Sequence, residues 1–225
     1  ATLIVQVACP CDWNSSGNLN SQDFFDFITS FFGSGADFNN DGVLDIATMG
    51  TNGSFASASV RLGRGDGTFG SATTYAYLGV GTAVVAGDLN GDGNSDLITL
   101  NSGGFTAVRL GRGDGTFTLS QSFDDLSSGS PWAADLELGD FNGDGVLDLV
   151  TAAYRASNGR LLARMGTGNG TFGALAVSIT DGSGAFGNIS VGDLNGDKIA
   201  DLVIGEEYYA PTLKIRTFIG TGTGS

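Results

Sequence analysis

Short runs of apolar and β-branched residues alternate along most of the chain with turns rich in Gly, Asn and Asp. One such series consists of Thr82–Gly87, Asp96–Leu100, Ala107–Leu110 and Thr118–Phe123. Each run is four to six residues long, which suits a β-strand and is too short for an α-helix. The pattern therefore predicts four short strands, joined by turns, in each of several similar units.

An acidic loop and a glycine turn recur in every unit. The loops begin at residues 37, 88, 140 and 193, so the period is 51 to 53 residues. They read Asp37-Phe-Asn-Asn-Asp-Gly-Val-Leu-Asp45, Asp88-Leu-Asn-Gly-Asp-Gly-Asn-Ser-Asp96, Asp140-Phe-Asn-Gly-Asp-Gly-Val-Leu-Asp148 and Asp193-Leu-Asn-Gly-Asp-Lys-Ile-Ala-Asp201. The turns are Gly63–Phe69, Gly111–Phe117, Gly166–Phe172 and the shorter Gly220–Gly224. Four short strands at this period are typical of a propeller blade, so we expect an all-β fold.

The acidic loops, together with turns of the form Leu-Gly-x-Gly-Asp-Gly-Thr-Phe, resemble FG-GAP (VCBS-type) repeats. Such repeats build the blades of integrin α-subunit propellers and of many secreted bacterial proteins. The resemblance covers residues 37–225 and implies propeller-like, four-stranded blades near residues 37–87, 88–139, 140–192 and 193–225. It also implies that the acidic loop joins the first two strands of a blade and holds Ca²⁺. Related propellers commonly close with about seven blades, whereas four repeats are visible in this chain.

The two ends of the repeat region each lack a predicted strand. Phe31–Ala36 stands where the first strand of repeat one is expected, and repeat four stops before its fourth strand. The segment Ala1–Ala8 is a strong strand candidate that could fill one gap. It could do so in its own chain or, by strand addition, in a neighbouring molecule.

Residues 9–36 predict a separate unit. Asp12, Asn14, Ser16 and Asp23 have the spacing of a twelve-residue EF-hand loop, with Ser in the fifth and Asp in the twelfth place. The apolar residues 24, 25, 27, 28, 31 and 32 predict a short amphipathic helix that ends at Gly33. The unit is similar to a dockerin-like half EF-hand, and this resemblance implies that those four residues are Ca²⁺ ligands.

The four acidic loops carry oxygen-bearing side chains at alternate positions. A loop of this form brings them toward one point, and Ca²⁺ prefers six to eight oxygen ligands, whereas Mg²⁺ keeps several waters. In each loop the resemblance implies ligands at the first, third, fifth and ninth residues, with the seventh contributing its backbone carbonyl. These are Asp37, Asn39, Asp41, Val43 and Asp45; Asp88, Asn90, Asp92, Asn94 and Asp96; Asp140, Asn142, Asp144, Val146 and Asp148; and Asp193, Asn195, Asp197, Ile199 and Asp201.

The alternative is a metal-free, Asx-rich turn, which is disfavoured because three carboxylates held close together repel each other. Lys198 replaces the sixth-position Gly of the other loops and brings an ammonium near the site. We therefore expect the fourth loop to be the weakest of the four.

Composition excludes several classes of function. The net charge of −14 argues against nucleic acid as a partner, and the absence of His removes the commonest general base. Free carboxylates such as Asp135 and Glu137 have no motif that joins them, so we do not expect an enzyme. No apolar run is long enough to span a membrane. Ala1–Ala8 lacks a basic flank and so indicates a processed chain, while the redox state of Cys9 and Cys11 stays open.

The sequence as a whole predicts a secreted, Ca²⁺-stabilised, non-catalytic structural or adhesion protein of the cell surface or extracellular matrix. Two more specific roles stay open. One is a homo-oligomer or filament formed by strand addition through the N-terminal segment. The other is a lectin-like module that binds glycans or surface proteins through stacking aromatics, for which the candidates are Trp13, Trp132, Tyr154, Tyr208 and Tyr209.

Overall fold

The computed structural model describes residues 37–52, 55–78, 80–126, 132–155, 158–181, 185–207 and 214–222. Over these residues the chain is all β and forms fourteen strands. They are β1 Ile46–Asn52, β2 Phe55–Arg61, β3 Thr73–Leu78, β4 Gly81–Gly87, β5 Asp96–Asn101, β6 Phe105–Gly111, β7 Phe117–Asp124, β8 Trp132–Gly139, β9 Asp148–Arg155, β10 Asn158–Gly166, β11 Phe172–Asp181, β12 Ala185–Gly192, β13 Asp201–Glu207 and β14 Lys214–Phe218. The predicted Ala1–Ala8 strand, the Asp12–Asp23 loop and the helix after it lie outside the described residues.

The strands form four antiparallel sheets. Each of the last three sheets combines the strand before an acidic loop with the strands after it, so the sheets are offset from repeats counted from one loop to the next. Blade 1 is β1-β2-β3, blade 2 is β4-β5-β6-β7, blade 3 is β8-β9-β10-β11 and blade 4 is β12-β13-β14. Strands that are neighbours in sequence are neighbours in each sheet, because the short glycine and Asx turns permit only hairpin connections. The predicted four-stranded antiparallel sheet is thus confirmed twice, in residues 81–124 and 132–181.

The two outer blades have three strands each within the described part of the chain. Blade 1 begins with the strand that follows its acidic loop, so it has no counterpart of β4 or β8. Blade 4 ends with β14 and has no counterpart of β7 or β11. These are the positions at which the sequence lacks a predicted strand.

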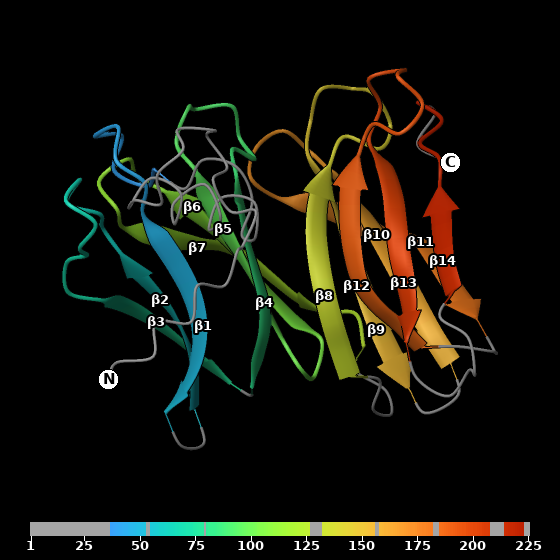
Figure 1. The fold of residues 1–225 in the computed structure, drawn as a ribbon, viewed down its shortest axis with the longest axis horizontal. Helices are drawn as coiled ribbons and strands as arrows, with labels where there is room; N and C mark the ends of the chain where they lie inside the picture. The colour runs from blue at the N-terminus through green and yellow to red at the C-terminus, as the bar shows by residue number, and fades with distance from the viewer. Residues whose placement is uncertain are drawn as a thin grey trace, which may run out of the picture.

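The four blades follow one another across the molecule in chain order (Figure 1). The first strands of successive blades contact one another, with β4 against β8 and β8 against β12. Blades 1 and 4 lie at opposite ends of this row (Figure 1). Over the described residues the blades therefore form an open row, and no closed propeller is seen.

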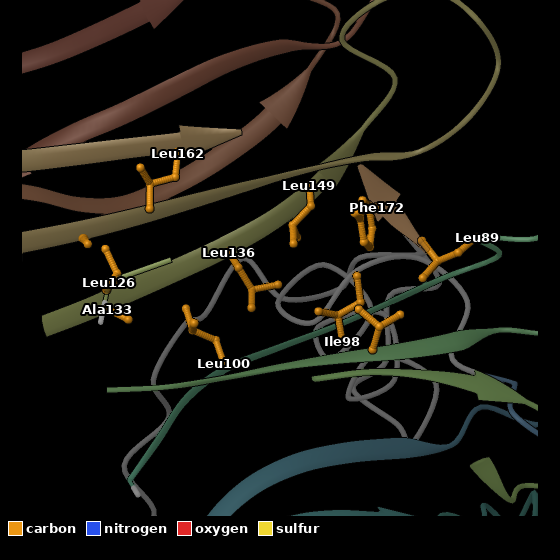
Figure 2. Close-up of a cluster of buried hydrophobic side chains, with 11 residues drawn as sticks. Leu89, Ile98, Leu100, Leu126, Ala133, Leu136, Leu149, Leu162 and Phe172 are labelled. Carbon is orange, nitrogen blue, oxygen red and sulfur yellow. The ribbon is translucent and has the colours of Figure 1, made fainter. Parts of the chain in front are cut away.

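The hydrophobic core lies between the blades. Successive residues of a strand point to opposite faces of its sheet. On β5, Leu97 therefore joins a cluster shared with blade 1, while Ile98 joins a cluster shared with blade 3. Figure 2 shows the second cluster, in which Ile98 and Leu100 of blade 2 approach Leu136 and Leu149 of blade 3. A third cluster joins blades 3 and 4. Because both faces of blade 2 are covered, its inner strands β5 and β6 are buried along most of their length, whereas β7 at its edge is largely exposed.

Polar side chains add specific ties between blades 2 and 3. The amide of Gln121 accepts from the backbone N–H of Phe172 (2.8 Å) and donates to its carbonyl (3.0 Å), as a neighbouring strand would. The Arg164 guanidinium forms a two-pronged ion pair with Asp125, with one N–O distance of 2.7 Å, and lies 4.2 Å from the centre of the Phe123 ring.

Nowhere in the described part of the chain is there a helix long and apolar enough to cross a membrane.

Candidate metal-binding loops

In blades 2 to 4 the acidic loop begins at the end of the first strand and ends at the start of the second, and in blade 1 it leads into β1. The second loop, for example, follows β4 at Gly87 and runs into β5 at Asp96. The third and fourth loops connect β8 to β9 and β12 to β13 in the same way. The expected position between the first two strands of a blade is therefore confirmed for blades 2 to 4.

The first, third and fifth side chains hold the loop in shape by accepting backbone hydrogen bonds. In the second loop, Asp88 accepts from Gly91 N–H (2.8 Å) and Gly93 N–H (2.9 Å). Asp92 accepts from Asn94 N–H (2.8 Å), and the Asn90 amide donates to the other Asp92 oxygen (3.0 Å). The other loops repeat this pattern, with Asp37, Asp140 and Asp193 in the place of Asp88. The three oxygen-bearing side chains thus lie together on an exposed loop.

Each loop needs left-handed backbone at its fourth and sixth positions. The fourth residues, Asn40, Gly91, Gly143 and Gly196, have φ values between 59° and 82°. At the sixth position the first three loops have Gly, whereas the fourth has Lys198 with a φ of 70°. The positive φ at Lys198 is a backbone conflict, since only Gly adopts this region without a steric cost.

The ninth residue of each loop has a different environment from the other three. Its carboxylate is buried, and each of its two oxygens accepts one backbone N–H. In blade 2, Asp96 accepts from Leu89 N–H (2.9 Å) at the start of the loop and from Gly111 N–H (2.8 Å) at the glycine turn. The same pair of bonds is made by Asp45, Asp148 and Asp201. This closing Asp therefore connects the start of the acidic loop to the end of the strand that leads into the glycine turn.

Burial raises the pKa of three closing carboxyls, Asp45, Asp96 and Asp148. The two backbone N–H bonds act in the opposite direction and lower each pKa. Repulsion from the first and fifth carboxylates of the same loop raises it further. The loop thus concentrates negative charge beside a carboxylate that is already poorly solvated.

The predicted ligands are only partly arranged as a coordination sphere. Among the described residues, no group of three or more Asp, Glu, Cys or His side chains has the geometry of a metal cluster. The side-chain oxygens at positions one, three and five are engaged with backbone N–H groups, and the closing Asp is turned to two N–H donors. The donor set itself consists of carboxylate and amide oxygens, which fits a hard cation such as Ca²⁺. Asp12, Asn14, Ser16 and Asp23 lie outside the described residues.

The sequence did not reveal the structural role of the closing Asp, although a signal was present. Every repeat that has a closing Asp also has a glycine turn, and the first glycine of that turn is the second hydrogen-bond partner. A Cβ at Gly111 would collide with the carbonyl of Ser95, and the same holds for Gly63, Gly166 and Gly220 against the matching residue. The co-occurrence of Asp and Gly is thus explained by a close backbone approach.

Two acidic residues outside the loops are also close to each other, on one face of β8. Asp135 accepts from the backbone N–H of Ile189 (3.0 Å) and so connects β8 to β12. Burial, together with the nearby Asp135, raises the pKa of Glu137 to about 7. Asp135 thus has a structural partner in the next blade, a contact that no sequence motif indicated.

Comparison with known families gives two matches to the repeat region. The FG-GAP-like repeat matches residues 37–99 and 88–151, and the FG-GAP repeat matches residues 132–177. No curated protein matches the chain. The fourth loop lies beyond these matches, yet its Asp201 makes the same two hydrogen bonds as the other closing residues. From the matched repeats, which span more than half of its length, the chain belongs to the FG-GAP repeat family.

Proposed function

We propose that this protein is a secreted, Ca²⁺-stabilised, non-catalytic adhesion or binding module of the cell surface or extracellular matrix. The FG-GAP repeats are consistent with a non-catalytic adhesion or binding module. The observation that carries the proposal is the fourfold repetition of one loop whose donors are all oxygen. In three of the loops burial, and then repulsion from the first and fifth carboxylates, raises the pKa of the closing Asp.

Calcium would supply positive charge at the point where the carboxylates of each loop repel one another. The chain's own residues would do the rest. The first, third and fifth side chains would bind, and the closing Asp would keep the loop attached to the glycine turn. Extracellular calcium is high enough to fill sites of modest affinity, which supports a location outside the cell.

The test is thermal unfolding of the full chain in millimolar Ca²⁺ and in excess chelator. One site held at 100 times its Kd contributes about 2.7 kcal/mol. In a chain of this size that raises the Tm by roughly 5–10 °C, and further filled sites add to the shift. We expect the Asp92→Asn variant to show a smaller calcium-dependent shift than the wild type. Asp66→Asn, a carboxylate in the glycine turn of blade 1, is the matched control and should keep the full shift. A melting curve that does not respond to calcium would refute the proposal.

A second candidate role is self-assembly through the Ala1–Ala8 segment. One observation favours it: β14 pairs with β13 only, so within the described residues it is an edge strand. Edge strands present unpaired backbone groups that accept a further strand. The lectin-like role stays a prediction, because the side chains of its candidate aromatics are not among those described.

A further inference from the structure

Successive blades meet through a contact that is repeated along the row. We call the face of a blade that looks toward the next blade its forward face, and the opposite face its rear face. The glycine turns of blades 2 and 3 reach back to the acidic loop of the blade before them. Gly115 N–H of blade 2 donates to Phe38 O of blade 1 (2.9 Å), and Gly170 N–H of blade 3 donates to Leu89 O of blade 2 (3.2 Å).

An apolar side chain of the forward face also packs against the glycine that makes this hydrogen bond, Gly115 or Gly170. A Cβ added at Gly115 would lie 2.7 Å from the Leu62 side chain, and one added at Gly170 would collide with Leu110. Leu62 and Leu110 stand immediately before the glycine turns of their own blades. The forward faces of blades 1 and 2 thus each offer a carbonyl and a large apolar side chain to a glycine of the next blade.

Blade 4 has the same forward face, but it is exposed. Leu194 occupies the position of Leu89 and is 53% exposed, whereas Leu89 is 4% exposed. Ile219 occupies the position of Leu110 and is 50% exposed. Ile215 occupies the position of Leu161 of blade 3 and is 68% exposed, whereas Leu161 is 4% exposed. A cluster of large apolar side chains on one surface marks an interaction site.

Blade 1 presents the matching rear face. Its Gly63–Phe69 turn has the same form as the turns that dock in blades 2 and 3. Gly67 has a φ of 83°, close to the 79° of Gly115 and the 80° of Gly170. Phe69 is only half-buried, whereas the corresponding Phe117 and Phe172 are buried between blades.

We propose that the forward face of blade 4 binds the rear face of blade 1 in a second copy of this chain. Gly67 of one copy takes the place of Gly170, with its N–H on Leu194 O of the other copy. Leu194, Ile215 and Ile219 are then covered as their counterparts are within the row. The two surfaces differ, so the contact is head-to-tail rather than self-complementary. The proposal concerns the face of blade 4 and does not depend on strand addition at its edge or on calcium.

The experiment is light scattering coupled to size-exclusion chromatography on the full chain, over about 1–100 μM, a range suited to interfaces of modest affinity. We expect the molar mass to rise with concentration and Ile215→Lys to hold it at that of one copy. Leu119→Lys is the matched control, because Leu119 is 58% exposed on β7 of blade 2 and should leave association unchanged.

A second variant tests the other surface. Gly67→Asn keeps a residue that tolerates left-handed backbone but adds a side chain where the docked glycines have none. It should also prevent association by itself. A mixture of Ile215→Lys and Gly67→Asn chains should form a species of two copies, because each variant retains one intact face.

Several results would overturn the proposal. One is a wild type that keeps the mass of one copy throughout the range, and another is equal association of Ile215→Lys and wild type. Loss of association on deletion of residues 1–8 alone would assign assembly to strand addition instead. A monomeric wild type that Ile215→Lys destabilises would show that the chain covers this face itself. A monomer that still melts in a calcium-dependent way would refute this inference while leaving the proposed function intact.

Discussion

Lys198 illustrates how a single backbone angle sets the quality of a loop. A non-glycine residue in the left-handed region costs about 1–2 kcal/mol, and Lys198 carries this cost with a φ of 70°. The other three loops avoid it at the sixth position by using Gly. The fourth loop is therefore strained in its backbone, independently of any charge that the ammonium adds.

Replacing Lys198 by Gly should stabilise the chain. Removing the steric cost outweighs the extra entropy that Gly has in the unfolded state, which leaves a net gain of about 1 kcal/mol. We expect the Tm in chelator to rise by about 2–4 °C. Lys198→Asn, which tolerates this conformation better than Lys, should give a smaller rise. A Lys198→Gly chain that melts at or below the wild-type temperature would contradict this account.

Glu137 is the residue whose titration should change the stability of the chain near neutral pH. Its pKa rises from 4.5 to about 7, first because of burial and then because of Asp135. A carboxyl with a raised pKa binds its proton more tightly in the folded state than in the unfolded state. Its favourable contribution to stability is therefore complete below pH 4.5 and is lost as the pH rises through about 7.

The Glu137→Gln variant should accordingly be more stable than the wild type at pH 8 and similar to it near pH 4.5. The full shift corresponds to about 3.4 kcal/mol, and the partial solvation of the carboxylate reduces the expected difference to about 1–2 kcal/mol. Urea unfolding of both chains at the two pH values measures this difference, and other titrating groups cancel in the comparison. A difference that is the same at both pH values would rule out titration of Glu137 as its cause.

At the scale of elements, the closing Asp fixes where three segments meet. In blade 2, Asp96 stands at the start of β5 and binds both the beginning of the acidic loop and the end of β6. Since the carboxylate is fully buried, its two N–H partners have no water to replace it. The closing Asp makes the same two backbone hydrogen bonds in all four repeats, so it holds the same three segments together in every blade.

We expect Asp96→Ala to destabilise the chain by about 2–4 kcal/mol in chelator. Each buried N–H left without an acceptor costs about 1–3 kcal/mol, and removal of a poorly solvated charge offsets part of the total. Denaturant unfolding measures this loss without any contribution from bound calcium. Asp66→Ala removes an exposed carboxylate from a glycine turn and should have a much smaller effect. Equal losses in the two variants would show that burial of the closing carboxylate is unimportant.

The strands of the middle blades could be predicted from sequence because local patterns determine them. The predicted run Asp96–Leu100 becomes β5, which extends one residue further, and Thr118–Phe123 lies within β7. The alternation of short apolar runs with glycine-rich turns is enough to predict the position of these strands. The fourfold repeat likewise predicts four similar sheets.

Contacts between distant residues could not be predicted in the same way. The sequence predicts the ninth residue of each loop as a ligand but does not reveal its two backbone N–H partners, because a carboxylate reads identically in either role. In the first loop the ninth residue is Asp45, and its partner Gly63 is 18 residues away. Arg164 is likewise 39 residues from its partner Asp125. The Arg164–Asp125 pair depends on how blades 2 and 3 stack, which periodicity within one repeat does not specify. Asp45 and Gly63 instead stand at the open end of one hairpin, β1–β2.

At the scale of the whole molecule, the location of the core between the blades has a consequence for how stability is distributed. The described residues form three hydrophobic layers for four blades, and no layer lies within a single blade. A middle blade is held on two sides and an outer blade on one, as in a linear array with nearest-neighbour coupling. Fraying should therefore start at the outer blades and move inward. A fragment of two adjacent blades would retain two of the four blades but only one of the three hydrophobic layers. Shortening the row should therefore lower the free energy of unfolding by a larger fraction than it shortens the chain.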